Sequence, residues 1–116
     1  MDGTTGRVEG CDIAVERRPG VTVVTVGGEL CPDTSPWVSA WLAAVADRTI
    51  GRLVLDLQGL DLITAAGVTV LVGLAERCSG SGTELRLWRP GAAADQLLRL
   101  CEVDRLVAID GDDRVW

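Results

Sequence analysis

The sequence predicts an α/β domain, a sandwich in which a mixed, mostly parallel sheet of about five strands carries helices mainly on one face. Short apolar runs of branched residues alternate along the chain with longer segments whose apolar positions recur at helical spacing. Turns containing Gly, Ser or Pro separate these segments. The 116 residues suit one domain. We expect residues 1–10 to be a flexible Gly/Thr-rich tail and residues 11–116 to be that domain.

The N-terminal half is predicted to hold a hairpin followed by a helix. Residues 12–18 alternate between apolar and polar side chains, which is typical of a half-exposed edge strand. A Pro-Gly turn leads to a second strand at residues 21–26, which are rich in Val and Thr. Thr34 or Asp33 is expected to cap a helix that has a proline in its first turn and ends near Ala46.

The central segment is predicted to form a strand, a turn and a helix. Residues 53–57 are mostly branched and apolar, which suits a strand buried on both faces. Apolar side chains then recur at steps of three, one and three from Val68 to Ala75, so a helix is expected there. The turn at residues 62–67 presents free backbone N–H groups and the positive end of the helix dipole. Such a place suits an anion, a phosphate or the edge of a partner protein.

The last third of the chain continues the alternation of strands and helices. Residues 78–82 are predicted to be a flexible turn, and residues 83–88 a strand with alternate side chains inward. A helix is expected to start near Pro90 and to run to about Cys101. Residues 106–109 would form a short final strand.

Composition excludes several classes of function. The chain has no His and no C-x-x-C spacing, so neither a metal site nor a cofactor is expected. It also lacks a G-x-S-x-G or P-loop motif, so an enzyme is not predicted. The net charge of −6 and the absence of a basic patch argue against nucleic acid as a partner. No apolar run is long enough for membrane insertion and no signal peptide is visible, so we expect a cytoplasmic protein.

Several smaller features of the sequence allow two interpretations. The four Cys are expected to be reduced thiols, with a regulatory disulfide between Cys78 and Cys101 as the alternative. The acidic segment near residue 112 is expected to be a solvated turn rather than a cation site. Trp37 and Trp41 lie four residues apart and are expected to belong to the core side of their helix.

The central segment DLQGLDLITAAGVTVLVGL resembles the STAS domain of bacterial anti-sigma factor antagonists, whose pattern is roughly D-L-S-x-V-x-F-I-D-S-S-G-L-G-V-L. The positions that match this pattern are Asp56, Leu57, Gly67, Val68, Val70 and Leu71. The phosphorylation triplet differs, because Thr64 takes the place of Asp, Ala65 of the phosphorylated Ser, and Ala66 of the second Ser or Thr. The resemblance therefore marks Ala65 as a degenerate phosphosite.

Two further segments carry the resemblance. GGELC is similar to the G-E-L-D that closes the family's second strand, with Cys31 in the position of the Asp. GAAADQLLRLCEVDRLVAID is similar to the family's last helix and strand. STAS domains typically add another C-terminal helix, for which residues 111–116 are too short. We expect Trp116, a partner or a second copy to cover the surface that the missing helix would cover.

The resemblance implies a non-enzymatic interaction module that binds an anti-sigma factor with a serine-kinase fold. In the family, this kinase phosphorylates the serine and then dissociates. Ala65 offers no oxygen to modify, so release by that route is not expected. The expected contact residues are Cys31, Asp33, Thr34, Ser35, Thr64, Ala65, Ala66, Gly67 and Val68.

Alternatives remain for this function and for single residues. One is a STAS subunit of a lipid-trafficking ABC transporter, another a small-ligand or nucleotide-binding module, and a homodimer is open in each case. Thr64 is expected to cap the helix rather than accept phosphate. Gly67 is either a simple helix-start glycine or a bare backbone that lets a partner approach. An exposed Val68 beside it would add a small apolar docking spot.

Overall fold

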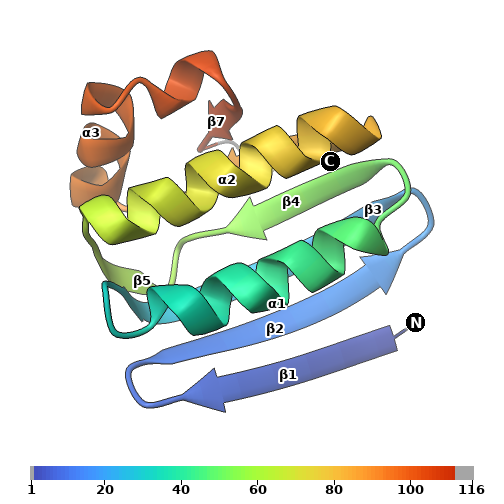
Figure 1. The fold of residues 1–116 in the computed structure, drawn as a ribbon, viewed down its shortest axis with the longest axis horizontal. Coiled ribbons are helices and arrows are strands. Elements are labelled where there is room, and N and C mark those ends of the chain that lie inside the picture. Colours follow the sequence, from blue (N-terminus) through green and yellow to red (C-terminus); the bar gives the residue numbers. More distant parts are fainter. Residues whose placement is uncertain (1, 112–116) are drawn as a thin grey trace.

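Seven strands form one mixed sheet in residues 2–111, the part of the chain that the computed structural model describes (Figure 1). The strands are β1 (Asp2–Val8), β2 (Cys11–Arg18), β3 (Val21–Leu30), β4 (Arg52–Asp56), β5 (Leu60–Ile63), β6 (Glu84–Trp88) and β7 (Ala108–Asp110). The helices are α1 (Ser35–Asp47), α2 (Ala65–Ser81) and α3 (Ala92–Leu100), followed by the 3₁₀ turn η1 (Val103–Arg105).

The strand order is β1-β2-β3-β4-β6-β7, and β5 pairs with the end of β3. The pairs β1·β2 and β2·β3 are antiparallel, and the other four pairs are parallel. The predicted mixed, mostly parallel sheet is therefore confirmed. It has more strands than the five expected, because β1 and β5 were not predicted.

The helices pack on one face of the sheet, as predicted (Figure 1). Leu53 and Leu55 of β4 point into the main core under the helices. Val54 points the other way and is fully buried with Val23 and Trp88 on the face without helices. The central strand is thus buried on both faces, which explains its continuous run of branched apolar residues.

The N-terminal segment is a strand, where the sequence predicted a loose tail. It pairs with β2 along its whole length, from Asp2 opposite Arg17 to Val8 opposite Cys11. Gly6 is part of the packing, since a Cβ at this position would lie 2.3 Å from the ring of Trp41. The backbone pairing with β2 and the close contact between Gly6 and Trp41 hold this segment in the sheet, although its side chains are mostly polar. As a consequence β2, predicted to be an edge strand, lies inside the sheet.

Helix α2 is longer than predicted at its C-terminal end. Residues 78–81, expected in a flexible turn, continue the helix, and Ser81 Oγ donates a hydrogen bond to the carbonyl of Arg77. Gly82 then ends the helix in the left-handed conformation, with φ 76°. A left-handed glycine is a common helix stop, and it sits one turn later than expected. The predicted helices α1 and α3 and strand β6 lie close to their expected bounds.

The two tryptophans of α1 are less buried than predicted. Val38, Leu42, Val45 and Ala46 make the buried side of the helix, whereas Trp37 and Trp41 only pack against the edge of the core. Trp116 and the expected lack of a further helix lie outside the described residues.

Candidate functional site

The two segments predicted to form a partner surface lie side by side at the carboxyl ends of β3 and β5. Leu30 pairs with Ile63 in this parallel ladder. The next residue, Thr64, donates its backbone N–H to the carbonyl of Leu30 at 3.0 Å and its hydroxyl to the same oxygen at 3.5 Å. The turn after β3 and the start of α2 are therefore joined by direct hydrogen bonds.

Thr34 organises the turn that leads into α1. Its hydroxyl accepts a hydrogen bond from the N–H of Cys31 at 3.1 Å and donates to the carbonyl of Glu29 at 2.7 Å. Thr34 occupies the N-cap position of α1, but its side chain does not cap the helix. The hydroxyl instead closes the turn, which holds the backbone of residues 31–34 in one conformation.

The predicted contact residues divide into an exposed set and a buried set. Asp33 and Ala65 are exposed, and Cys31, Thr64 and Ala66 are half-buried. The four buried residues are Thr34, Ser35, Gly67 and Val68. An exposed Val68 would have formed an apolar docking spot, but its side chain is only 7% exposed and belongs to the main core. We call the exposed and half-buried set (Cys31, Asp33, Thr64, Ala65 and Ala66) the partner surface.

Gly67 packs the start of α2 against the two strands beneath it. A Cβ at this position would lie 2.7 Å from Leu30 Cγ, 2.8 Å from Ile63 Cγ1 and 2.8 Å from the Leu30 carbonyl oxygen. No real Cβ tolerates such distances, so only glycine fits without a shift of the helix. Of the two interpretations of Gly67, this geometry favours packing over approach by a partner.

The nearest side chain, that of Thr64, does not cap the backbone N–H groups at the start of α2. Thr64 is the N-cap residue, with an extended backbone at φ −112° and ψ 179°, yet its hydroxyl makes no capping bond. The expected capping role of Thr64 is therefore wrong. The first amides of a helix have no partner within the helix, so an exposed ligand or protein edge can reach them beside Ala65.

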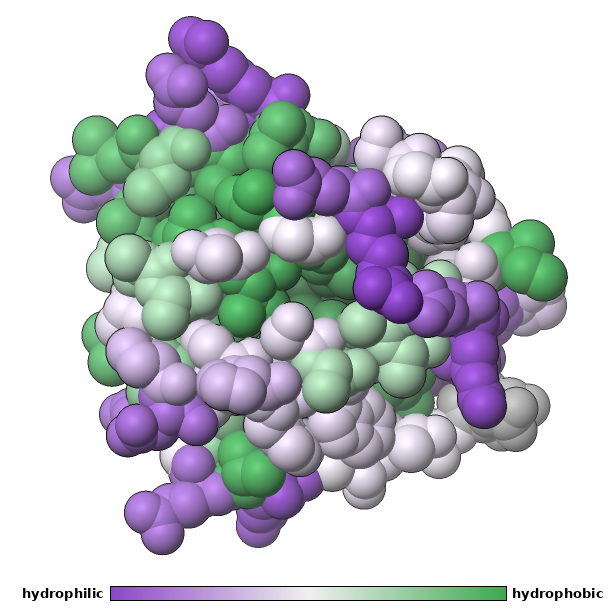
Figure 2. All heavy atoms as spheres, viewed as in Figure 1, coloured by the Kyte–Doolittle hydropathy of each residue, from purple (hydrophilic) through white to green (hydrophobic). Residues whose placement is uncertain are grey.

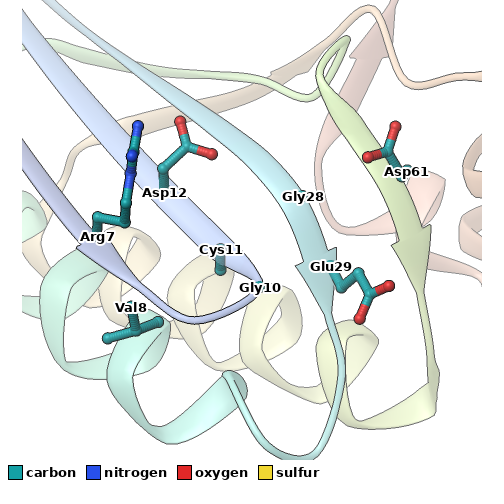
Figure 3. Close-up of a pocket in the computed structure, with 8 residues that line it drawn as sticks. All are labelled: Arg7, Val8, Gly10, Cys11, Asp12, Gly28, Glu29 and Asp61. Atoms are coloured by element: carbon teal, nitrogen blue, oxygen red, sulfur yellow. The ribbon is translucent and has the colours of Figure 1, made fainter.

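An acidic cavity that the sequence did not predict lies next to this surface (Figure 3). It has a volume of about 420 Å³ and is lined by side chains from β1, β2, β3 and β5. The charged residues around it are Arg7, Asp12, Glu29 and Asp61. In Figure 3 Asp12 and Arg7 point to the same side, while Glu29 and Asp61 come from the neighbouring strands. It was missed because residues 1–10 were not expected to be a strand.

Cys11 lies at the same cavity with its thiol turned into the core. Burial raises the pKa of the Cys11 thiol, and the nearby Asp12 and Cys31 raise it further. The thiol therefore stays protonated at neutral pH and is a poor nucleophile. All four cysteines, including Cys78 and Cys101, are free thiols in the structure.

Within the described residues, no three Cys, Asp or Glu side chains lie close enough together to hold a metal ion. Over the same range, no helix has both the length and the apolar character needed to cross a membrane.

Comparison with known proteins identifies the family. A family model described as the STAS domain matches residues 12–113. The chain belongs to the STAS domain family. In this STAS domain the match begins in β2, so it includes both segments of the partner surface but not β1. No curated protein sequence matches the chain.

Solved structures share this fold at low sequence identity. An anti-sigma factor antagonist from Mycobacterium paratuberculosis superimposes with a TM-score of 0.76 at 24% identity, covering 89% of this chain and 87% of the other. SpoIIAA from Bacillus, an anti-sigma factor antagonist in its unphosphorylated form, gives 0.72 at 12% identity, with 87% and 90% covered. The murine anion transporter Slc26a9 gives 0.69 at 19% identity, covering 78% of this chain but 16% of the transporter. These likenesses establish the α/β STAS fold with its mixed sheet and three helices.

Proposed function

We propose that this STAS domain is a non-enzymatic interaction module that binds an anti-sigma factor of serine-kinase fold through the partner surface. The observation that carries the proposal is the junction of two loops by the Thr64–Leu30 hydrogen bonds, with Asp33 and Ala65 exposed on either side. The buried residues Thr34 and Gly67 hold these loops from below and do not themselves reach a partner. The likeness to the antagonists named above supports the class of partner.

Ala65 would make this binding insensitive to the kinase. Its methyl group is exposed at the first residue of α2, beside the free amides. A phosphate there would add nearly two negative charges and would disrupt a docked partner that lacks arginines to receive it. Because Ala65 carries no oxygen, we infer that the complex persists where a serine-containing relative would be released.

The charge around the surface favours a basic partner. Asp33 is exposed on the turn before α1, and Glu29 and Asp61 are exposed at the adjacent cavity. The whole chain carries a net charge of −6. Complementary charge mainly raises the association rate, so binding through this surface should weaken as salt increases.

The test is capture of purified anti-sigma factors of serine-kinase fold from the host organism, measured by calorimetry with ATP present. The wild-type chain should bind one of them and remain unmodified at residues 64–67 by mass spectrometry. Ala65→Asp places a carboxylate on the partner surface and should weaken binding by about tenfold or more. Ala65→Ser should bind like wild type without ATP and be released once ATP is added.

A matched control is Ala93→Asp, since Ala93 is exposed on α3 and outside the partner surface. This variant should bind like the wild type. Equal binding by the Ala65→Asp variant, or phosphate on Thr64 of the wild-type chain, would contradict the proposal.

A further inference from the structure

Helix α1 has an exposed side without charged residues, although the ring of Trp41 on that side also packs over Gly6 of β1. Its sequence from Ser35 to Ala46 contains no charged residue, although 24% of the whole chain is charged. Pro36, Ala40 and Ala44 are exposed, and Trp37 and Trp41 are half-buried. We call these five residues the outer face of α1. Ser39 is the only exposed polar residue between Ser35 and Ala46, and a helix with so little polar surface is normally buried.

The outer face consists of two bulky residues that alternate with small ones. The rings of Trp37 and Trp41 lie 5.8 Å apart at their centroids and are tilted by 50°. Figure 1 places α1 in front of the sheet, and in the same view Figure 2 shows mostly white, pale green and pale lilac over it. An uncharged surface of this kind, with half-exposed aromatic rings, is typical of protein interfaces.

Hollows lie along both sides of the helix. One, of about 620 Å³, runs between α1 and β1 and is lined by Ala40, Trp41 and Ala44, together with the charged residues Arg17 and Arg48. The other, of about 220 Å³, lies between α1 and α2 beside Ala43 and Gly73. The surface therefore has ridges formed by tryptophan and adjacent grooves with small residues, which is the shape needed for helix-to-helix packing.

We propose that the outer face of α1 binds the same face of a second copy, with the two helices antiparallel. A two-fold axis between Ala40 and Trp41 would place Trp37 of one copy against Ala44 of the second copy, and Ala40 against Trp41 of the second copy. Each large side chain then meets a small one. A symmetric dimer requires this self-complementarity, and the spacing of the outer face provides it.

The charges at the ends of the helix fit the same arrangement. Asp33 precedes α1 and Arg48 follows it, and both are exposed. Neither side chain takes part in an ion pair with any residue of the described range 2–111. The two-fold axis brings Asp33 of each copy to Arg48 of the second copy. Antiparallel helices also place the positive end of one dipole beside the negative end of the other.

The outer face of α1 carries no charge, so it suits a second copy of the same face better than an acidic or basic ligand. Two chains that each carry a net charge of −6 repel one another. An interface free of charge in its centre, with an opposite-charge pair at each end, avoids this repulsion where the chains touch.

The test is sedimentation velocity of the full chain from about 5 to 500 µM, a range that spans the affinities of weak homodimers. The wild type should show a monomer–dimer equilibrium. Ala40→Glu and Ala44→Glu each place a carboxylate against a tryptophan of the second copy, and each should weaken the dimer by about tenfold or more. Both residues are exposed on a helix and Glu favours helices, so the monomer stays folded, as circular dichroism would verify.

Ala93→Glu on the exposed side of α3 is the matched control and should leave the dimer unchanged. Arg48→Glu and Asp33→Arg should each weaken the dimer, and the double variant should restore it, because the exchanged charges again face each other. A chain that is monomeric at every concentration overturns the proposal, as does a dimer unaffected by both glutamates. Failure of the double variant to rescue overturns the antiparallel arrangement.

Discussion

Gly67→Ala tests whether the start of α2 is packed as tightly as the structure shows. Alanine normally stabilises a helix relative to glycine by about 1 kcal/mol. At Gly67 the new methyl group would meet Leu30 Cγ at 2.7 Å, Ile63 Cγ1 at 2.8 Å and the Leu30 carbonyl oxygen at 2.8 Å. The oxygen belongs to the backbone and accepts a hydrogen bond from Thr64, so it cannot move aside cheaply.

The size of the effect follows from comparing Gly67 with Gly73 in the same helix. A Cβ on Gly73 would meet nothing within 4 Å, so Gly73→Ala should gain about 1 kcal/mol of unfolding free energy. Overpacking a well-packed site typically costs about 1–3 kcal/mol. Gly67→Ala should therefore be less stable than Gly73→Ala by about 1–3 kcal/mol, and at or below the wild type in stability.

Urea unfolding followed by circular dichroism measures both variants against the wild type. Equal slopes with shifted midpoints would show that stability alone has changed. The expected order of midpoints is Gly73→Ala, then wild type, then Gly67→Ala. If Gly67→Ala were stabilised as much as Gly73→Ala, the start of α2 would not lie against Leu30 and Ile63, and the assigned role of Gly67 would be wrong.

Two other predictions concern ion pairs. Arg77 of α2 donates two hydrogen bonds of 2.8 Å to Asp47 of α1 and thereby holds the pKa of the Asp47 carboxyl below its ordinary value. The pair should stabilise the fold above the ordinary Asp pKa and lose this effect as the pH falls, so the difference in urea midpoint between wild type and Asp47→Asn should shrink in acid. Arg89 lies over the ring of Trp88 at 3.8 Å and bonds at 2.8 Å to Asp56, whose side chain is 11% exposed. Arg89→Ala should therefore cost about 1–3 kcal/mol of unfolding free energy, because Asp56 loses its charged donor. Arg99→Ala, which removes the solvent-accessible pairs with Asp95 and Asp104, should cost under about 1 kcal/mol. Equal losses for the two arginines would argue against a structural role for the Arg89–Asp56 pair.

Elements with a strong local pattern were predictable from the sequence. The branched apolar run at residues 53–57 identified a strand buried on both faces, and Leu53, Val54 and Leu55 are fully buried. The proline and the apolar spacing after Thr34 identified α1. In both cases, the pattern of the segment itself reflects its burial.

Elements that depend on distant partners were not predictable. Strand β1 is polar and rich in glycine. It is held by pairing with β2 and by the contact of Gly6 with Trp41, and neither produces a periodic pattern of apolar residues in the segment itself. Short strand β5 was taken for part of a turn because it has only four residues, of which two are exposed.

The candidate site was predictable as a pair of segments but not as a surface. Thr34 and Ser35 are polar and were expected to be exposed, yet both are buried. The hydroxyl of Thr34 bonds to backbone groups of its own turn, which satisfies it inside the protein. Val68 shares the apolar face of α2 with Leu71 and Ala75, and the structure buries all three, so the helical spacing was a better guide to Val68 than the resemblance.

The two proposed surfaces meet at Asp33. This residue belongs to the partner surface, and in the proposed dimer it faces Arg48 of the second copy. Asp33 cannot contact both at once, so dimerisation should compete with binding of the anti-sigma factor. At high concentration Ala40→Glu should then raise the apparent affinity for the anti-sigma factor, since fewer sites are covered by a second copy. Ala65→Asp should weaken partner binding without changing the dimer, because Ala65 lies on α2, away from the outer face of α1. Ala40→Glu should therefore weaken only the dimer, and Ala65→Asp only the binding of the anti-sigma factor. If either variant lost both kinds of binding, the partner surface and the outer face of α1 would be a single surface.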